Sequence, residues 1–159
     1  MDDKVVRDYL RRFLNWREAH ADLKSAFKDV PFEDQGKRPP KSPHSPWQIL
    51  EHMRLAQNDI LEFCTNPKYK ARNWPDDYWP KKPAPPDESA WGKSVKAFEK
   101  DLKDLQDVVS DPKRDLEMPI PHGSGQTVFR EALLVADHNA YHVGQLVLVR
   151  RLLGCWPET

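Results

Sequence analysis

The segment NPKYKARNWPDDYWPKKPAPP, residues 66–86, limits the fold of this chain more than any other feature. Proline fixes φ and lacks a backbone N–H, so a stretch this rich in proline cannot form an internal helix or a central strand. An extended chain covers about 3.3 Å per residue and a helix rises about 1.5 Å, so this linker can run back along a helix of about 20 residues. The sequence therefore predicts that the helices on either side of it run parallel.

Apolar residues recur every three or four positions in four segments, the period of an amphipathic helix. The first covers about 3–30 and has His20 on its apolar stripe. The second starts at Ser45, where SPWQ offers an N-cap, a proline at the first helical position and the glutamine of a capping box. The third covers about 87–110, and the fourth runs from Thr127 to a stop at Gly154. We therefore expect an all-α protein.

The remaining segment, about 115–126, contains two prolines and the turn residues HGSG, so it is expected to be an irregular hairpin. A length of 159 residues fits one domain, 1–159, with a core of its own.

The charge balance argues against partners that are held by long-range electrostatics. Lys plus Arg and Asp plus Glu both number 25, and no basic cluster stands out, so nucleic-acid binding is not expected. No run approaches the roughly 20 apolar residues of a membrane span, and the charged N-terminus does not resemble a signal peptide. We expect a soluble cytoplasmic protein, in which Cys64 and Cys155 are reduced, apolar residues without chemistry.

The most informative stretch is DHNAYHVGQ, which places His138 and His142 four residues apart in the most apolar helix. Side chains at i and i+4 lie one above the other on a helix, which is a metal-ligand spacing. His52 lies on the inward face of the second segment. If these helices are antiparallel, a rise of about 1.5 Å per residue brings His52 to within one or two turns of the pair. His52, His138 and His142 are therefore the candidate metal ligands.

A second interpretation stays open, in which these histidines are hydrogen-bonded core residues without a metal. Burial of several imidazoles without partners costs a few kcal/mol each, whereas one divalent cation satisfies a nitrogen on every ring. Asp59 lies two turns beyond His52 on the same face and is either a surface group or a hydrogen-bond partner of a metal-bound imidazole.

The capped helix with WQILEHM, the long linker and the HxxxHxGQ pattern of the last helix together resemble the DinB/YfiT-like superfamily, over nearly the whole chain. This resemblance implies a four-helix bundle of up-down-down-up topology with a divalent metal, zinc or nickel, on His52, His138 and His142. It also implies a metal-dependent enzyme of the thiol S-transferase or hydrolase type, whose small-molecule partners include low-molecular-weight thiols.

Three neutral protein ligands leave a coordination position open for a water or a thiolate, as in catalytic sites. His20 is the weak candidate for an acid or base, Gln145 is expected to orient a ligand or to pack, and Gly144 is expected to permit close helix packing. Two other functions remain, a metal-binding or sensing bundle without turnover and a metal-free interaction bundle. A homodimer is plausible because aromatic residues are expected on the surface.

Overall fold

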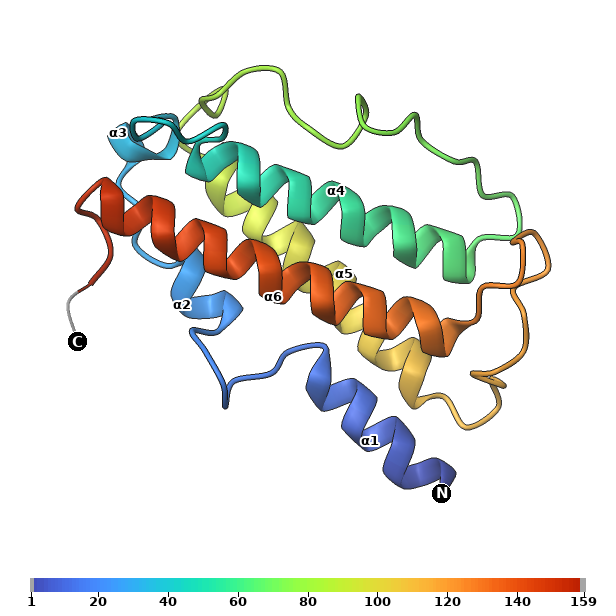
Figure 1. Cartoon of the computed structure of the whole chain (residues 1–159). Helices are drawn as coiled ribbons and strands as arrows, with labels where there is room; N and C mark the ends of the chain where they lie inside the picture. The colour runs from blue at the N-terminus through green and yellow to red at the C-terminus, as the bar shows by residue number, and fades with distance from the viewer. Residues whose placement is uncertain (1, 158–159) are drawn as a thin grey trace.

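The computed structural model describes residues 2–157, which contain six helices and no β-strand, so the predicted all-α class is confirmed. One isolated antiparallel bridge pairs Pro119 with Thr127 in the segment that precedes the last helix. Among these residues, no helix is long and apolar enough to cross a membrane. The helices in Figure 1 are α1 (Asp3–Phe13), α2 (Leu23–Phe27), α3 (Phe32–Gln35), α4 (Pro46–Thr65), α5 (Ala90–Ser110) and α6 (Val128–Leu152).

The long helices α4, α5 and α6 pack together, with α4 in contact with both of the others. Ser94 of α5 donates to the Glu51 carboxylate of α4, and Asn58 of α4 donates to Asp101 of α5 at 3.1 Å. In each pair the α5 residue comes 43 positions after its α4 partner. Because this separation stays constant along the two helices, α4 and α5 run parallel, as the linker predicts. Figure 1 shows α6 running in the opposite direction beside α4.

The linker between α4 and α5 returns along the outer side of α4 (Figure 1). Near the start of α4, the Ser45 hydroxyl donates to the Pro83 carbonyl, and the Gln48 amide donates to the Pro80 carbonyl at 2.8 Å. Ser45 and Gln48 also form the predicted capping box. A Cβ on Gly36 would lie 2.6 Å from the Cβ of Ala84, so the end of the linker is packed closely against the chain.

The prediction of one helix over 3–30 was wrong, because the structure divides this segment into α1 and α2. Residues 14–22 form a turn and a bend, and the Asp22 carboxylate then accepts the backbone N–H of Ser25 at 2.8 Å as a new N-cap. Asp residues favour such caps because the side chain replaces a missing backbone acceptor. The chain turns again at Asp29, where φ is +53°. The apolar stripe therefore continues over two helices rather than one.

The core lies between the long helices and is closed by α1 and α2. A fully buried amide, Gln57, joins all three long helices, since it donates to the Phe98 carbonyl of α5 and accepts from Asn139 of α6. Burial of a large apolar side chain contributes roughly 1.5–3 kcal/mol. Side chains of this kind that are at most 2% exposed include Leu14, Ile49, Leu50, Met53, Phe98, Leu105, Val135 and Leu146.

A second buried polar group, Arg150 of α6, fixes the end of α2. Its guanidinium is fully buried and donates to the carbonyls of Ser25 and Ala26, at 3.1 and 2.9 Å, and to that of Cys155 at 2.8 Å. Carbonyls at a helix end lack intrahelical partners, and one side chain satisfies several of them here. The Trp156 ring lies 4.9 Å from this guanidinium.

We predict that Arg150→Met lowers the free energy of unfolding by about 3 kcal/mol or more, because several buried carbonyls lose their donor at once. Urea denaturation followed by circular dichroism measures this difference. Arg151→Met is the matched control, since residue 151 is exposed, and it is expected to change stability by no more than about 0.5 kcal/mol. Equal effects of the two variants would contradict the assignment.

Candidate metal centre

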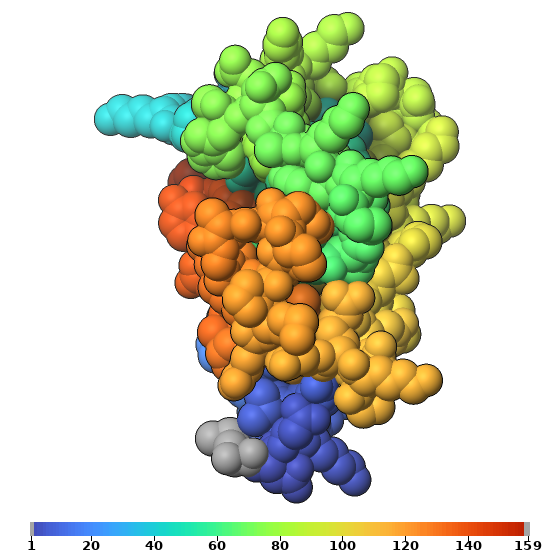
Figure 2. All heavy atoms as spheres, turned by 90° about the vertical axis from the view of Figure 1, so that its right-hand side faces the viewer, coloured from blue at the N-terminus to red at the C-terminus, as the bar shows by residue number. Residues whose placement is uncertain are grey.

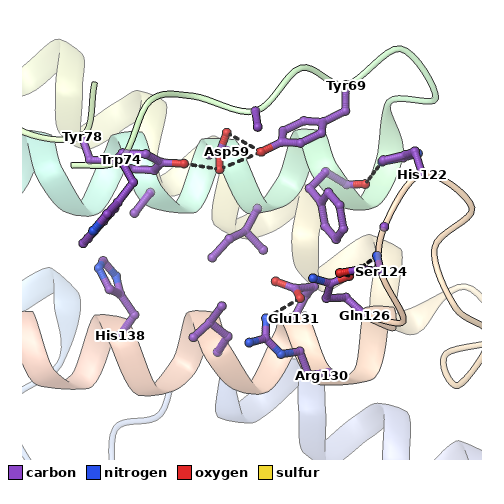
Figure 3. Close-up of a pocket in the computed structure, with 16 residues that line it drawn as sticks. Asp59, Tyr69, Trp74, Tyr78, His122, Ser124, Gln126, Arg130, Glu131 and His138 are labelled. Carbon is purple, nitrogen blue, oxygen red and sulfur yellow. Dashed lines mark hydrogen bonds and ion pairs between the residues drawn. The ribbon is translucent and has the colours of Figure 1, made fainter. Parts of the chain in front are cut away.

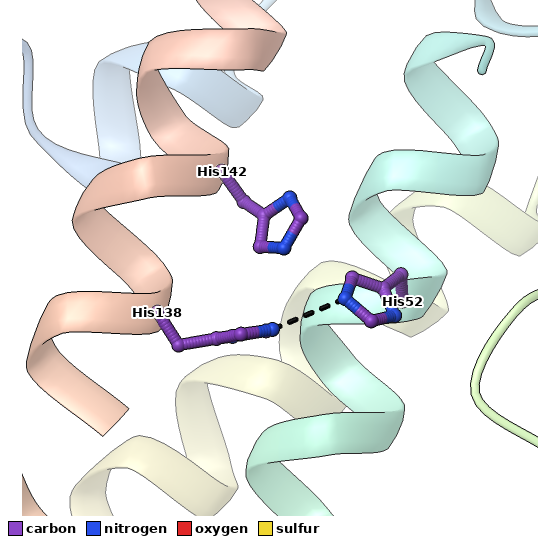
Figure 4. Close-up of side chains that lie close together, drawn as sticks. All are labelled: His52, His138 and His142. Carbon is purple, nitrogen blue, oxygen red and sulfur yellow. Dashed lines mark hydrogen bonds between the residues drawn. The ribbon is translucent and has the colours of Figure 1, made fainter. Parts of the chain in front are cut away.

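Helices α4 and α6 bring His52, His138 and His142 together (Figure 4). The Nε2 atoms of His52 and His138 are 3.1 Å apart, and one ring nitrogen from each of the three residues lies within 4.8 Å of the others. The expectation that His52 lies at the level of the 138/142 pair is therefore confirmed. His52 and His142 are buried and His138 is half-buried, so the cluster is open on the side of His138.

The outer nitrogens of two of these rings are held by hydrogen-bond acceptors. His52 Nδ1 lies 3.0 Å from the Tyr78 carbonyl oxygen, and His142 Nδ1 lies 2.8 Å from Gln145 Oε1. Because a carbonyl oxygen can only accept, both Nδ1 atoms carry the proton. Their Nε2 atoms consequently carry lone pairs, which is the tautomer that a metal-binding histidine uses. In this arrangement the lone pair of His52 Nε2 accepts from His138 Nε2 at 3.1 Å.

Burial keeps these imidazoles neutral at pH 7. Desolvation lowers the pKa of His52 to about 4, and it lowers the pKa of His142 to about 3 with a further contribution from the two neighbouring rings. The pKa of His138 is also lowered, mainly by burial. Since the charged form would bring like charges into one small volume, the cluster presents lone pairs rather than positive charge.

The linker supplies part of this site, which the sequence did not reveal. The Trp79 ring stacks on the His52 ring at a centroid distance of 3.8 Å and an angle of 3°, and its other face stacks on His44 at 3.8 Å. Together with the Tyr78 carbonyl, Trp79 fixes both the plane and the rotation of His52. The only signal in the sequence is the presence of aromatic residues in the linker, which were expected either to cover the bundle or to line a pocket.

Asp59 reaches His52 only through the linker. Its carboxylate accepts from the Tyr78 hydroxyl at 2.7 Å and from the Tyr69 hydroxyl at 3.2 Å, while the Tyr78 carbonyl accepts from His52. Asp59 therefore positions the segment that holds His52, and among the described residues no imidazole donates to it directly.

Other sequence expectations at this site need correction. His20 is exposed in the bend between α1 and α2, with its Nδ1 2.8 Å from the Ala21 carbonyl oxygen, and it lines a separate cavity of about 230 Å³. The break in the first expected helix removes it from the inward stripe and from the three histidines. A Cβ on Gly144 would meet nothing within 4 Å, so close helix packing does not require this glycine.

Cys64 is buried, and burial raises the pKa of its thiol to about 12. A thiol with so high a pKa is protonated at neutral pH, as expected for a cysteine that only fills space.

A cavity of about 680 Å³ extends from His138 along the seam between α4 and α6 (Figure 3). The linker forms one wall through Tyr69, Trp74 and Tyr78, and the segment 122–126 closes the far end. In an end-on view, this segment and the start of the linker lie at the same end of the molecule (Figure 2). A small molecule can therefore occupy a partly apolar space beside the three histidines.

Comparison with known protein families places this chain by its sequence. The sequence model of the DinB superfamily matches residues 15–146, most of the chain, including all three clustered histidines. No curated protein and no solved structure matches the chain.

We predict that His52 and His142 are both neutral Nδ1–H tautomers at pH 7 in protein treated with a chelator. Long-range ¹H–¹⁵N NMR spectra of the imidazoles distinguish the two tautomers. Gln145→Leu removes the acceptor of His142 and is expected to abolish the tautomer preference of that ring alone, because His52 keeps the Tyr78 carbonyl. An Nε2–H signal for either ring in the parent protein would contradict this geometry.

Proposed function

This chain belongs to the DinB superfamily, and from that premise we propose that His52, His138 and His142 bind one divalent metal ion, zinc or nickel. The observation that carries the proposal is the convergence of three neutral imidazoles, two of which have their Nε2 lone pairs fixed by acceptors on the opposite nitrogen. Metal-bound histidines commonly have such a partner.

The distances support this ligand set. Zinc–nitrogen bonds of about 2.0–2.1 Å at tetrahedral angles separate two ligand nitrogens by about 3.3 Å. The Nε2 atoms of His52 and His138 are 3.1 Å apart, close to this value, and the three ligand nitrogens lie within 4.8 Å of one another, so side-chain rotations of His142 toward the other two rings would complete the set. No carboxylate or thiol belongs to the cluster in the described part of the chain, and three neutral ligands without a fourth protein ligand are typical of catalytic metal sites.

We further propose that the protein is a metal-dependent enzyme of the thiol S-transferase or hydrolase type. A bound divalent ion acts as a Lewis acid and lowers the pKa of a coordinated water or thiol. The protein's own contribution is to hold three rings in place through Tyr78 and Gln145, to exclude water from two of them by burial, and to offer a cavity of about 680 Å³ for the substrate.

The antiparallel contact between α1 and α5 supports a four-helix topology of up-down-down-up type, with α2 and α3 as additions. Arg7 of α1 donates to the Val109 carbonyl near the end of α5, and Gln106 donates to the Arg11 carbonyl near the end of α1. A single domain, a low-molecular-weight thiol as partner, a homodimer and a cytoplasmic location stay predictions.

We predict that the tag-free protein, purified without immobilised metal, contains about one zinc or nickel ion per chain. His138→Ala is expected to lose most of this metal, because it removes one of three ligands, whereas His20→Ala is the matched control and should retain it. Elemental analysis by mass spectrometry measures the content. Absence of stoichiometric metal in the parent, even after reconstitution, would favour the metal-free bundle and refute the proposal.

A second prediction separates the enzyme from a binder without turnover. The metal-loaded protein should accelerate the reaction of a thiol such as L-cysteine with the chromogenic electrophile 1-chloro-2,4-dinitrobenzene, and chelation or His138→Ala should reduce the rate by roughly 10²-fold or more. Absorbance of the thioether product measures the rate. Tight metal binding without acceleration of this reaction or of ester hydrolysis would support the alternative of a metal-binding or sensing bundle.

A further inference from the structure

The cavity beside the histidines contains a buried carboxylate that the structure leaves partly unpaired. Glu131 of α6 is 3% exposed and lines the cavity. Its Oε1 accepts from Arg130 Nη1 at 2.6 Å, but within residues 2–157 its Oε2 accepts no hydrogen bond. Figure 3 shows this side chain pointing from α6 into the space between α6 and α4. Glu131 Oε2 is accessible from the cavity rather than sealed in the core, so an ammonium group of a ligand can donate a charge-assisted hydrogen bond to it.

Aromatic rings surround the same space. Phe63 and Tyr69 lie with their ring centroids 5.2 Å apart, Trp74 and Tyr78 form a second pair at 5.2 Å, and all four line the cavity. The face of an aromatic ring carries negative potential and attracts ammonium groups, most strongly where water is excluded. The cavity therefore combines aromatic rings with a carboxylate, Glu131, of which only one oxygen accepts a hydrogen bond. This combination favours a cationic ligand group over an anionic one.

Two arginines adjoin this space and have to be weighed against that preference. Arg72 lies 3.5 Å from Asp59, whose carboxylate is already satisfied by two tyrosine hydroxyls. The Arg130 side chain is 57% exposed, so its charge is largely solvated, whereas the Glu131 side chain is 4% exposed. The Glu131 side chain is thus the least exposed of these charged groups, whereas Arg130 is mostly exposed and Arg72 is paired with Asp59.

The spacing of Glu131 and His138 relates this carboxylate to the histidines. The two residues are seven positions apart on α6, which is close to two full turns, so they share one face at a separation of about 10 Å along the helix. Ile60 and Leu134 supply apolar surface in the same cavity. A ligand held at Glu131 by one end can therefore direct its other end toward His138.

We propose that this cavity binds a small molecule with a primary ammonium group, which donates to Glu131 while an apolar or reactive portion extends toward the three histidines. The proposal names the substrate class of the proposed metal enzyme and in that sense rests on the proposed function. The amine subsite itself consists of Glu131 and the aromatic wall, which do not belong to the histidine cluster, so its occupancy can be measured separately from the metal.

The experiment uses n-hexylamine, with 1-hexanol and hexanoate as probes of equal chain length, titrated calorimetrically into the full-length protein. Each titration is carried out on protein as purified and again after chelation, with metal content measured on the same samples. We expect n-hexylamine to bind at least tenfold more tightly than either other probe, with or without metal, since a hydrogen bond between charged groups in a buried site is a strong one.

Glu131→Gln keeps the shape of the side chain but removes its charge, and it should weaken n-hexylamine binding at least tenfold while leaving 1-hexanol binding unchanged. Glu117→Gln, at an exposed position outside the cavity, is the matched control and should change neither. Trp74→Ala removes an aromatic ring that is 72% exposed, so it should weaken amine binding without affecting folding.

Three results would overturn the proposal. The first is that hexanoate binds as tightly as n-hexylamine. The second is that Glu131→Gln binds n-hexylamine as tightly as the parent protein does. The third is that the folded parent protein shows no measurable binding of n-hexylamine. Amine binding that is lost on chelation would assign the probe to the metal rather than to Glu131. Absence of metal together with Glu131-dependent amine binding would instead refute only the metal function.

Discussion

The return of the proline-rich linker along α4 is the constraint on which the rest of the structure depends. Because the chain travels back to the start of α4, α5 runs parallel to α4, and α6 is left to approach from the opposite direction (Figure 1). The same path carries Tyr78 and Trp79 past the first half of α4, where they meet His52. One segment without regular structure thus sets the order of the helices and completes the environment of the histidine cluster.

Local signals in the sequence were sufficient for the parts of the fold that depend on neighbouring residues. Two helix starts show this. Ser45 and Gln48 form the predicted capping box, and Thr127 caps the last helix. Each of these hydrogen bonds joins residues only three positions apart. The spacing of His138 and His142 required only the helical period, and the level of His52 required the helical rise together with an antiparallel arrangement of the two helices. These predictions succeeded because each rests on a distance that the backbone itself determines.

The failures involve contacts between segments far apart in the sequence. The stripe over 3–30 has helical periodicity throughout, but α1 ends at Phe13 and the cap at Asp22 begins a second helix. The guanidinium of Arg150, 121 positions beyond Asp29, then binds the carbonyls at the end of that helix. The role of Tyr78 is carried by its backbone carbonyl, which has no side-chain signature. Gln57 links three helices through its side-chain amide, and the spacing of apolar residues carries no signal for a buried polar group of this kind.

The two faces of α4 contribute differently to stability. Toward α5, α4 makes polar contacts that all have partners: Ser94 donates to Glu51, Asn58 donates to Asp101, and the Gln57 amide donates to the Phe98 carbonyl. Toward α6, the same helix contributes His52, which meets His138 and His142 of α6, and the carboxylate of Glu131 lies along the same seam. Groups of this kind stabilise a fold little unless each has a partner. The apolar core shared by α4, α5 and α6 therefore stabilises the bundle, while the α4–α6 seam presents the ring nitrogens and the carboxylate oxygen that we propose as ligand-binding groups.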